Sequence, residues 1–171
     1  MEEHKKILDE MLNDNYINIL DLGSGKTSMS ILLNKFPNSN ITGICYPGDN
    51  RKLDKIRQVC KGNYMLVEKD ICKEVFKEKY DLILCHLLFG EATKFGNTVE
   101  DMANKLFSME SNNILLIDYL EDVDIDFLKL INIAEKKDYV VIKKEIYSKK
   151  IEQKYDTFIG KNYIGILFEK I

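Results

Sequence analysis

Two glycines that follow an acid are the residues of this chain best suited to hold a ligand. Asp21, Gly23 and Gly25 lie in the stretch 18–28, which reads NILDLGSGKTS. Apolar residues precede the glycines and apolar residues at helical spacing follow, so we expect a strand, a turn and a helix. Glycine permits positive φ and close approach of a ligand to the backbone, and a helix N-terminus offers unpaired N–H groups. The stretch therefore predicts a ligand-binding loop, with a plain strand-to-helix turn as the alternative.

The acid argues against a phosphate ligand. A nucleotide-phosphate loop of the form GxxxxGK[ST] would need glycine where Leu20 stands, and the dinucleotide form GxGxxG has Ser28 in place of its third glycine. Asp21 would repel a phosphate in either loop. A ligand with an ammonium and a sulfonium would instead gain charge-assisted hydrogen bonds, worth about 1.5–3 kcal/mol. S-adenosylmethionine is such a ligand, and nucleotide phosphates and NAD are the alternatives.

The elements that must position this loop alternate along the chain. Apolar spacing predicts an N-terminal helical lead-in over residues 1–15 and later helices at residues 29–36, 53–60, 99–106 and 127–134. β-branched and leucine-rich runs predict seven strands, at residues 17–22, 41–45, 64–67, 81–85, 114–118, 139–146 and 163–168. Most of these runs are continuously apolar, as is typical of parallel strands covered on both faces. A polar stretch joins the last two, which predicts an antiparallel pair.

The composition indicates one domain over residues 1–171, with a small molecule as its partner. The chain has 171 residues, 45% of them hydrophobic, and 25 basic against 28 acidic side chains for a net charge of −3. No general positive field would draw it to nucleic acid or to anionic lipid. No apolar run approaches the roughly 20 residues of a membrane span, and the acidic start is unlike a signal peptide. We therefore expect a cytoplasmic protein, and the oligomeric state stays open.

The cysteines and histidines are not spaced as metal ligands. The four cysteines form no C-x-x-C pair, and neither His4 nor His86 has a neighbour at ligand spacing. We expect buried thiols, no metal site and no disulfide framework.

The glycine stretch resembles the first motif of the class I S-adenosylmethionine-dependent methyltransferases, an acid followed by G-x-G at the end of the first strand. Asp21, Gly23 and Gly25 match this motif, while Thr27 departs from its third glycine. The resemblance implies that Asp21 lies near the methionine part of the cofactor. It places the segment of Gly23, Ser24 and Gly25 beneath that part.

The resemblance extends over nearly the whole chain, from residue 17 to residue 168. That family also has seven strands that end in an antiparallel pair. The implied fold is α/β, a Rossmann-like, doubly wound seven-stranded sheet. It is mostly parallel, with an antiparallel C-terminal strand and helices on both faces.

The end of the third strand resembles the family's adenine site, in which an acid accepts from the exocyclic amine and an apolar neighbour packs on the ring. Asp70 and Ile71 would take these roles here. A cap on a helix over residues 73–78 is the alternative for Asp70.

The end of the second strand departs from the family, which has an acid there to bind both ribose hydroxyls. Cys45 stands at this position, and a thiol is a weak acceptor. Asp49 is the candidate replacement, because a turn at residues 46–48 could direct it back toward the strand. Tyr46 could stack on the adenine, with a surface or core tyrosine as the alternative.

The fourth strand leads into the region where the family's chain passes the methyl group. Cys85 ends the strand and His86 follows it, so both are assigned to the cofactor site. With a pKa of about 6.5, His86 could accept a proton from a hydroxyl, amine or thiol acceptor. Packing in the wall of the site is the alternative. The motif [DNS]-P-P-[FYW], carried by enzymes that methylate exocyclic amines of bases, is absent here.

We expect the acceptor at the glycine-flanked stretch 89–96, since loops at the carboxyl ends of strands bind ligands in open α/β sheets. Asp118 and Glu121, after the fifth strand, could line the other side of the crevice or could cap a helix.

These residues together predict an S-adenosylmethionine-dependent methyltransferase with S-adenosylhomocysteine as its product. The composition favours a small-molecule acceptor over nucleic acid and indicates no membrane partner. A catalytically silent S-adenosylmethionine-binding module is the alternative, because Cys45 replaces the ribose acid and no substrate-capping domain is present.

Overall fold

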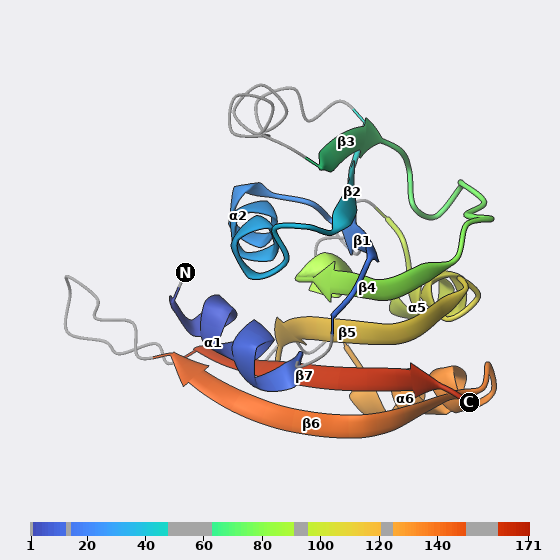
Figure 1. Cartoon of the computed structure of the whole chain (residues 1–171). Helices are drawn as coiled ribbons and strands as arrows, with labels where there is room; N and C mark the ends of the chain where they lie inside the picture. The colour runs from blue at the N-terminus through green and yellow to red at the C-terminus, as the bar shows by residue number, and fades with distance from the viewer. Residues whose placement is uncertain (1, 13–14, 48–62, 91–95, 121–124, 150–160) are drawn as a thin grey trace.

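A single mixed sheet forms the centre of the molecule (Figure 1). The computed structural model describes residues 2–12, 15–47, 63–90, 96–120, 125–149 and 161–171. Within these residues seven strands follow the order β3-β2-β1-β4-β5-β7-β6. The strands are β1 (Asn18–Leu22), β2 (Asn40–Cys45), β3 (Tyr64–Glu68), β4 (Tyr80–His86), β5 (Ser111–Tyr119), β6 (Tyr139–Lys149) and β7 (Lys161–Lys170).

The sheet is parallel from β3 to β5 and antiparallel at its C-terminal edge. β1 pairs in parallel with β2 and β4, β2 pairs likewise with β3, and β4 pairs with β5. β7 lies antiparallel between β5 and β6. The strand order therefore grows outward from β1 in two directions, to β2 and β3 on one side and to β4 and β5 on the other. The predicted doubly wound sheet with an antiparallel end is confirmed.

Helices cover both faces of the sheet. The described helices are α1 (Glu2–Met11), α2 (Lys26–Lys35), α5 (Val99–Leu106) and α6 (Phe127–Glu135). Alternate residues of β4 face opposite sides, so that Leu82 and Leu84 pack in the cluster with α1 and α2, while Ile83 and Cys85 pack in the cluster with α5 and α6. The continuous apolar pattern of the strand follows from this double coverage.

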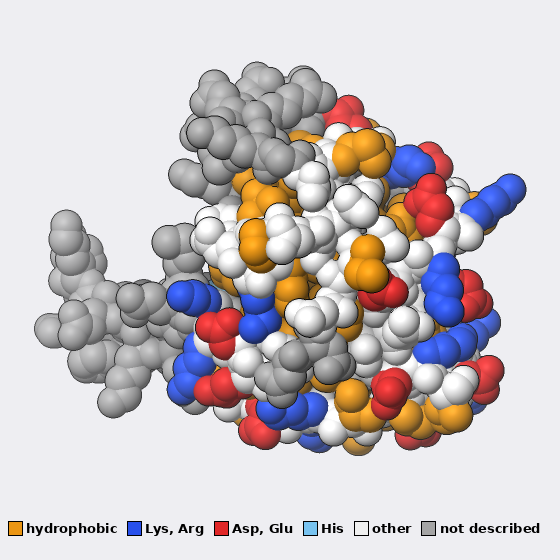
Figure 2. Space-filling view, viewed as in Figure 1, with side chains coloured by type: hydrophobic (Ala, Val, Ile, Leu, Met, Phe, Trp, Pro, Cys, Tyr) orange, Lys and Arg blue, Asp and Glu red, His pale blue; other side chains and the backbone are white. Residues whose placement is uncertain are grey.

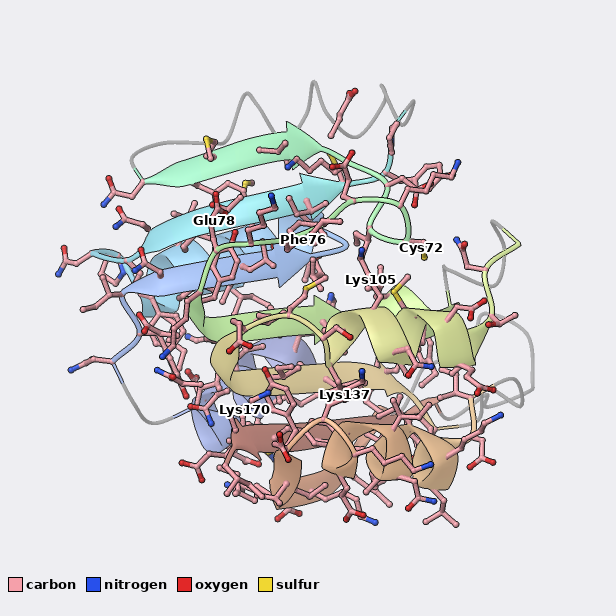
Figure 3. All side chains as sticks on the ribbon, turned by 90° about the vertical axis from the view of Figure 1, so that its right-hand side faces the viewer. Cys72, Phe76, Glu78, Lys105, Lys137 and Lys170 are labelled. Carbon is pink, nitrogen blue, oxygen red and sulfur yellow. The ribbon has the colours of Figure 1, made fainter. Side chains whose placement is uncertain are left out.

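The segment between β3 and β4 lacks the helix that the alternative role of Asp70 required. Residues 73–78 do not form a helix: a turn covers residues 71–73, and no helix follows it. Ile71 and Phe76 pack on the core of the α5 side. Burial, Asp70 and Asp101 raise the pKa of Cys72, while Lys105 of α5 opposes that rise, so this segment runs beside α5 (Figure 3).

Two further expectations can be compared with the structure. The predicted N-terminal lead-in is the helix α1, and the two C-terminal strands extend beyond the predicted runs, to Lys149 and from Lys161. The predicted helix at residues 53–60 lies outside the described residues.

Charges of both signs are interspersed on the face shown in Figure 2, without a large patch of one sign among the described residues. Among these residues, no helix is both long enough and apolar enough to cross a bilayer.

Gly43 permits a side chain to cross a strand. Tyr64 of β3 reaches over β2 at Gly43, which pairs with Asp21 of β1. A Cβ added at Gly43 would overlap the Tyr64 hydroxyl and would lie 2.7 Å from Ser24 Oγ. Glycine inside a strand commonly marks such a close approach.

We predict that Gly43→Ala lowers the free energy of unfolding by about 1–3 kcal/mol, the range for overpacking a dense core. Urea denaturation measures this change. Gly165→Ala is the matched control, because a Cβ at this β7 position would make ordinary contacts of 3.4–3.5 Å. Equal stability of the two variants would contradict the crossing of Tyr64 over Gly43.

Candidate active site

The predicted ligand loop lies at the carboxyl end of β1, beside the ends of β2 and β4. Leu22 pairs with Ile44 and with Cys85, so the residues after Leu22 enter the edge between these two neighbours. Sequence order departs in opposite directions from β1, to β2 on one side and to β4 on the other. Ligands of open α/β sheets bind at such a switch point.

The two glycines of the loop differ in backbone conformation and in the space around them. Gly23 has φ of 73°, in the left-handed region that favours glycine. A Cβ there would lie 3.2 Å from Leu88 Cδ1 and 3.5 Å from the carbonyl oxygen of His86, so the turn packs tightly on the chain after β4. Gly25 is the N-cap of α2, and a Cβ there would meet open space. The loop is therefore closed toward β4 at Gly23 and open at Gly25.

Asp21 is the central polar group of this site. Its side chain is fully buried, and its Oδ2 accepts hydrogen bonds from Ser28 Oγ at 2.8 Å and from Tyr64 Oη at 2.9 Å. Its Oδ1 is buried and has no hydrogen-bond partner among the described residues. A buried carboxylate oxygen without a partner is costly, so Oδ1 is the atom of this site that could accept a hydrogen bond from a ligand.

Burial raises the pKa of Asp21 from 3.8 to about 6, although the hydrogen bonds from Ser28, Tyr64 and Ser24 oppose the rise. Desolvation is the larger effect because a charged carboxylate loses its water here. A cation beside Oδ1 would reverse this balance and favour the charged form.

Sequence reasoning missed two residues that hold Asp21 and a third that makes room for one of them. Tyr64 and Ser28 donate to its Oδ2, and the hydroxyl of Tyr64 also bonds that of Ser24. Gly43 gives Tyr64 its path. The one signal in the sequence was Gly43, an isolated glycine within an apolar strand.

The last residue of β2 is Cys45, and not the acid that would bind a ribose. Cys45 is buried, and its Sγ donates to the carbonyl oxygen of Val67 at 3.5 Å. Tyr46 is exposed, with 39% of its surface accessible. Glu68 pairs with Cys45 at the end of β3 and is also exposed, a neighbour that sequence reasoning missed. Asp49 lies outside the described residues.

The acid after β3 caps a turn. Asp70 Oδ1 accepts from the backbone N–H of Cys72 at 3.1 Å, and its Oδ2 lies 3.5 Å from Lys73 Nζ. Ile71 is buried. Asp70 thus caps a turn, and not the helix over residues 73–78 that its alternative role required. The carbonyl of Cys45 accepts from Lys69 N–H at 3.0 Å, which holds Asp70 and Ile71 at the same edge as the glycine loop.

The end of β4 brings two titratable groups to the loop. Burial, followed by Asp118 and Asp21, raises the pKa of Cys85 well above its ordinary value, so its thiol stays neutral. Burial, followed by His4, lowers the pKa of His86 to about 3. The expectation that His86 keeps an ordinary pKa is therefore wrong: it is a neutral and weakly basic imidazole at pH 7.

Asp118 organises the chain that leaves β4. It is fully buried at the end of β5. Its Oδ2 accepts a hydrogen bond from the N–H of Phe89 at 3.1 Å, and its Oδ1 accepts one from the N–H of Tyr119 at 2.9 Å. Leu87, between His86 and Phe89, has φ of 54°, a strained conformation for leucine. The two roles expected for Asp118, lining the crevice or capping a helix, stay predictions. Glu121 and residues 91–95 of the expected acceptor loop lie outside the described residues.

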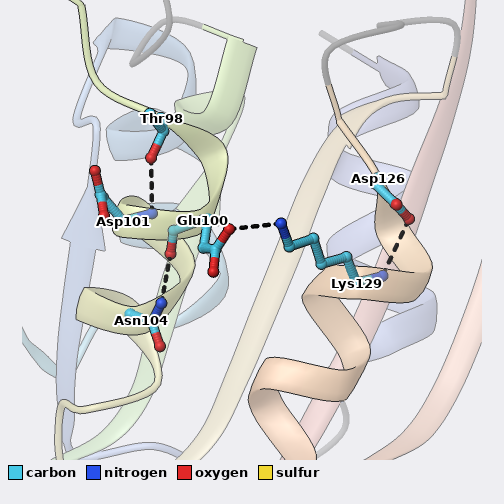
Figure 4. Close-up of polar contacts among 6 residues, drawn as sticks. All are labelled: Thr98, Glu100, Asp101, Asn104, Asp126 and Lys129. Atoms are coloured by element: carbon cyan, nitrogen blue, oxygen red, sulfur yellow. Dashed lines mark hydrogen bonds and ion pairs between the residues drawn. The ribbon is translucent and has the colours of Figure 1, made fainter.

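A separate cavity of about 320 Å³ lies between α5 and α6. Its rim carries an ion pair of 2.5 Å between Glu100 and Lys129, and Thr98 and Asp126 cap the two helices (Figure 4). The side chains of the pair are about half exposed, and such pairs contribute little to stability. No residue of the predicted site lines this cavity.

Among the described residues, no three histidine, cysteine, aspartate or glutamate side chains form a group that could hold a metal ion.

No protein-family model matches this chain, and no curated protein matches it by sequence. Solved structures do match in fold. A TehB-like SAM-dependent methyltransferase from Corynebacterium glutamicum has a TM-score of 0.67 and 17% identity, over 99% of this chain and 88% of its own. Magnesium protoporphyrin IX methyltransferase from Synechocystis, with bound SAH, has a TM-score of 0.70 and 13% identity, over 99% and 84%.

A proposed RNA methyltransferase from Pyrococcus horikoshii matches with a TM-score of 0.66 and 15% identity, over 99% of this chain and 82% of its own. These similarities show that the chain has the fold of the class I S-adenosylmethionine-dependent methyltransferases. Two of these names specify different acceptors, RNA and magnesium protoporphyrin IX, so the shared fold does not select one.

We predict that Asp21→Asn stabilises the ligand-free protein at pH 7 but hardly at pH 4. The pKa of Asp21 is raised in the folded state, so its favourable contribution is present below 3.8 and is lost as the pH rises through about 6. The loss reaches at most about 3 kcal/mol, and the amide avoids it. Urea denaturation of both proteins between pH 4 and pH 7 measures the difference. A difference independent of pH would contradict the raised pKa.

Proposed function

We propose that this chain, which has the class I methyltransferase fold, binds S-adenosylmethionine and transfers its methyl group to a small-molecule acceptor. One observation carries the proposal: the unpartnered Oδ1 of Asp21, buried at the glycine loop. The cofactor is a cation with an ammonium donor, which supplies both what Oδ1 lacks and a charge that favours the carboxylate. A phosphate would supply neither.

The remaining contacts follow the edge of the sheet. The backbone of Gly23, Ser24 and Gly25 would lie beneath the methionine part. Asp70 and Ile71 would take the adenine, since they are held beside the end of β2. The ribose acceptor would come from Asp49 or from Glu68, because Cys45 donates to Val67.

The chain's own task in methyl transfer is alignment. The bound sulfonium supplies an activated methyl group, so the protein needs to orient the acceptor and exclude water. Cys85 is buried and neutral, which makes it a packing group and not a competing nucleophile. The neutral His86 would accept a hydrogen bond from the acceptor without retaining its proton.

A silent binding module is the second candidate, and Cys45 is the observation that favours it. If no side chain replaces the missing ribose acid, affinity falls by the worth of a charged hydrogen bond, about 1.5–3 kcal/mol. Activity with any acceptor would exclude this candidate.

We predict that S-adenosylhomocysteine binds more tightly as the pH rises from 5 to 7. Below pH 6 the ligand's ammonium must displace a proton from Asp21, so affinity should fall by up to about tenfold per pH unit. Calorimetry in buffers of different ionisation enthalpy should detect proton release near pH 6. Asp21→Asn should abolish the release and weaken binding about tenfold or more.

Asp126→Asn is the control for this experiment, because the carboxylate of Asp126 caps the N-terminus of α6. It should leave affinity and proton release unchanged. Binding that neither releases a proton nor depends on Asp21 would refute the placement of the cationic end. A saturable thermal stabilisation by magnesium and ATP, without any by S-adenosylhomocysteine, would refute the proposed cofactor.

We predict that one of two acids replaces the ribose acid. Asp49→Asn or Glu68→Gln should weaken S-adenosylhomocysteine binding about tenfold to a hundredfold, the equivalent of one hydrogen bond to a charged group. Cys45→Asp should recover the lost affinity in that background. Unchanged binding in both single variants would show that no acid meets the ribose and would support the silent module.

A further inference from the structure

The N-terminal helix α1 brings His4, one of the chain's two histidines, to the edge of the sheet that carries the candidate active site. His4 of α1 is buried, and its Nδ1 is hydrogen-bonded to Nε2 of His86 at the end of β4. The two rings meet edge to face, with centroids 4.6 Å apart. In Figure 1 the N-terminal end of α1 lies on the side toward which β4 and β5 point. The carboxyl edge of the sheet thus includes a residue from the lead-in helix.

Aromatic packing holds His4 in this position. Its ring meets that of Tyr163 edge to face at 5.0 Å, and Tyr163 packs on Tyr119 of β5 at the same separation. These tyrosines lie at the start of β7 and the end of β5, which are paired. The antiparallel strand β7 therefore contributes Tyr163 to the packing that holds the histidine pair.

We propose that His4 is a positioning residue for the methyl acceptor: it accepts the Nε2–H of His86 and so leaves Nδ1 of His86 to receive a hydrogen bond from the acceptor. A neutral imidazole carries one N–H and one bare nitrogen, so the partner of Nε2 decides which kind Nδ1 is. The inference rests on the proposed function. It adds α1 to the acceptor site.

The backbone places His86 beside the cofactor loop. Its carbonyl oxygen would lie 3.5 Å from a Cβ at Gly23, and the strained Leu87 follows it. A bare Nδ1 at this place selects acceptors with a hydrogen on the nucleophilic atom, namely amines, hydroxyls and thiols. It gives no such contact to a carbon nucleophile or a tertiary amine.

The transfer then does not require His86 to take up a proton. The acceptor's lone pair forms the bond to the methyl carbon, the carbon–sulfur bond breaks with its electron pair on sulfur, and the acceptor's proton passes to water. Because burial and His4 keep His86 neutral, it orients the lone pair and does not hold that proton.

Nitrogen NMR of the free protein tests the tautomer directly. Only two histidines contribute imidazole signals, so His4→Phe and His86→Phe assign them. We expect Nε2 of His86 to be protonated and Nδ1 to be bare. In His4→Phe, which keeps a ring against Tyr163, the tautomers should mix and the pKa of His86 should rise. His4→Gln, whose amide oxygen can accept Nε2–H, should restore the tautomer, and Lys5→Ala on the exposed side of α1 should change neither signal.

Ligand titration tests the acceptor role. S-adenosylhomocysteine has no group at the methyl position, whereas sinefungin has an amine there. Sinefungin should shift the Nδ1 signal of His86 more than S-adenosylhomocysteine does, and His4→Phe should reduce that difference. A protonated Nδ1 in the free protein, or equal responses to both ligands, would overturn the role of His4. Failure of S-adenosylhomocysteine to bind in calorimetry would overturn the proposed function itself, and with it the acceptor role.

Discussion

The buried carboxylate of Asp21 is the constraint on which the rest of the site depends. It has lost its water, and two side-chain donors serve only one of its oxygens. Those donors come from α2 and from β3, so the orientation of the carboxylate depends on three adjacent strands and a helix. Gly43 is required because any larger residue would block Tyr64. The carboxylate therefore couples the packing of one face of the sheet to the chemistry at its edge.

The unpartnered carboxylate of Asp21 has a cost in stability. A carboxylate with a pKa of about 6 destabilises the folded chain at neutral pH, and the tertiary structure offsets that cost elsewhere. The offset is visible in the core, where both faces of β4 are buried under helices. Strained or unsatisfied groups persist in proteins where the surrounding packing determines them, and they concentrate at functional sites. The left-handed Leu87 beside His86 is a second example at the same edge.

The antiparallel end of the sheet has a comparable double role. β7 continues the sheet beyond β5 and provides the surface on which α1 packs, with Gly165 facing Ile7 and Met11. Near its start the same strand carries Tyr163, whose ring packs on that of His4. A C-terminal strand and an N-terminal helix thus meet beside His86, the last residue of β4. The fold tolerates identities of 13–17% because alternation and burial, and not particular side chains, determine the sheet.

The sequence by itself determined the architecture and the position of the glycine loop at the end of the first strand. Apolar runs of strand length, helical spacing between them and glycines after Asp21 are local patterns, and local backbone preferences and burial periodicity encode them. Only the tertiary structure decided what surrounds each group. Asp70 caps a turn and not a helix over residues 73–78, and burial and contact with His4 lower the pKa of His86 from the ordinary value that we expected. Tyr64 and His4 entered the site from distant positions. Desolvation and contact between residues far apart in the chain leave no periodic trace, because they depend on which surfaces the folded sheet brings together.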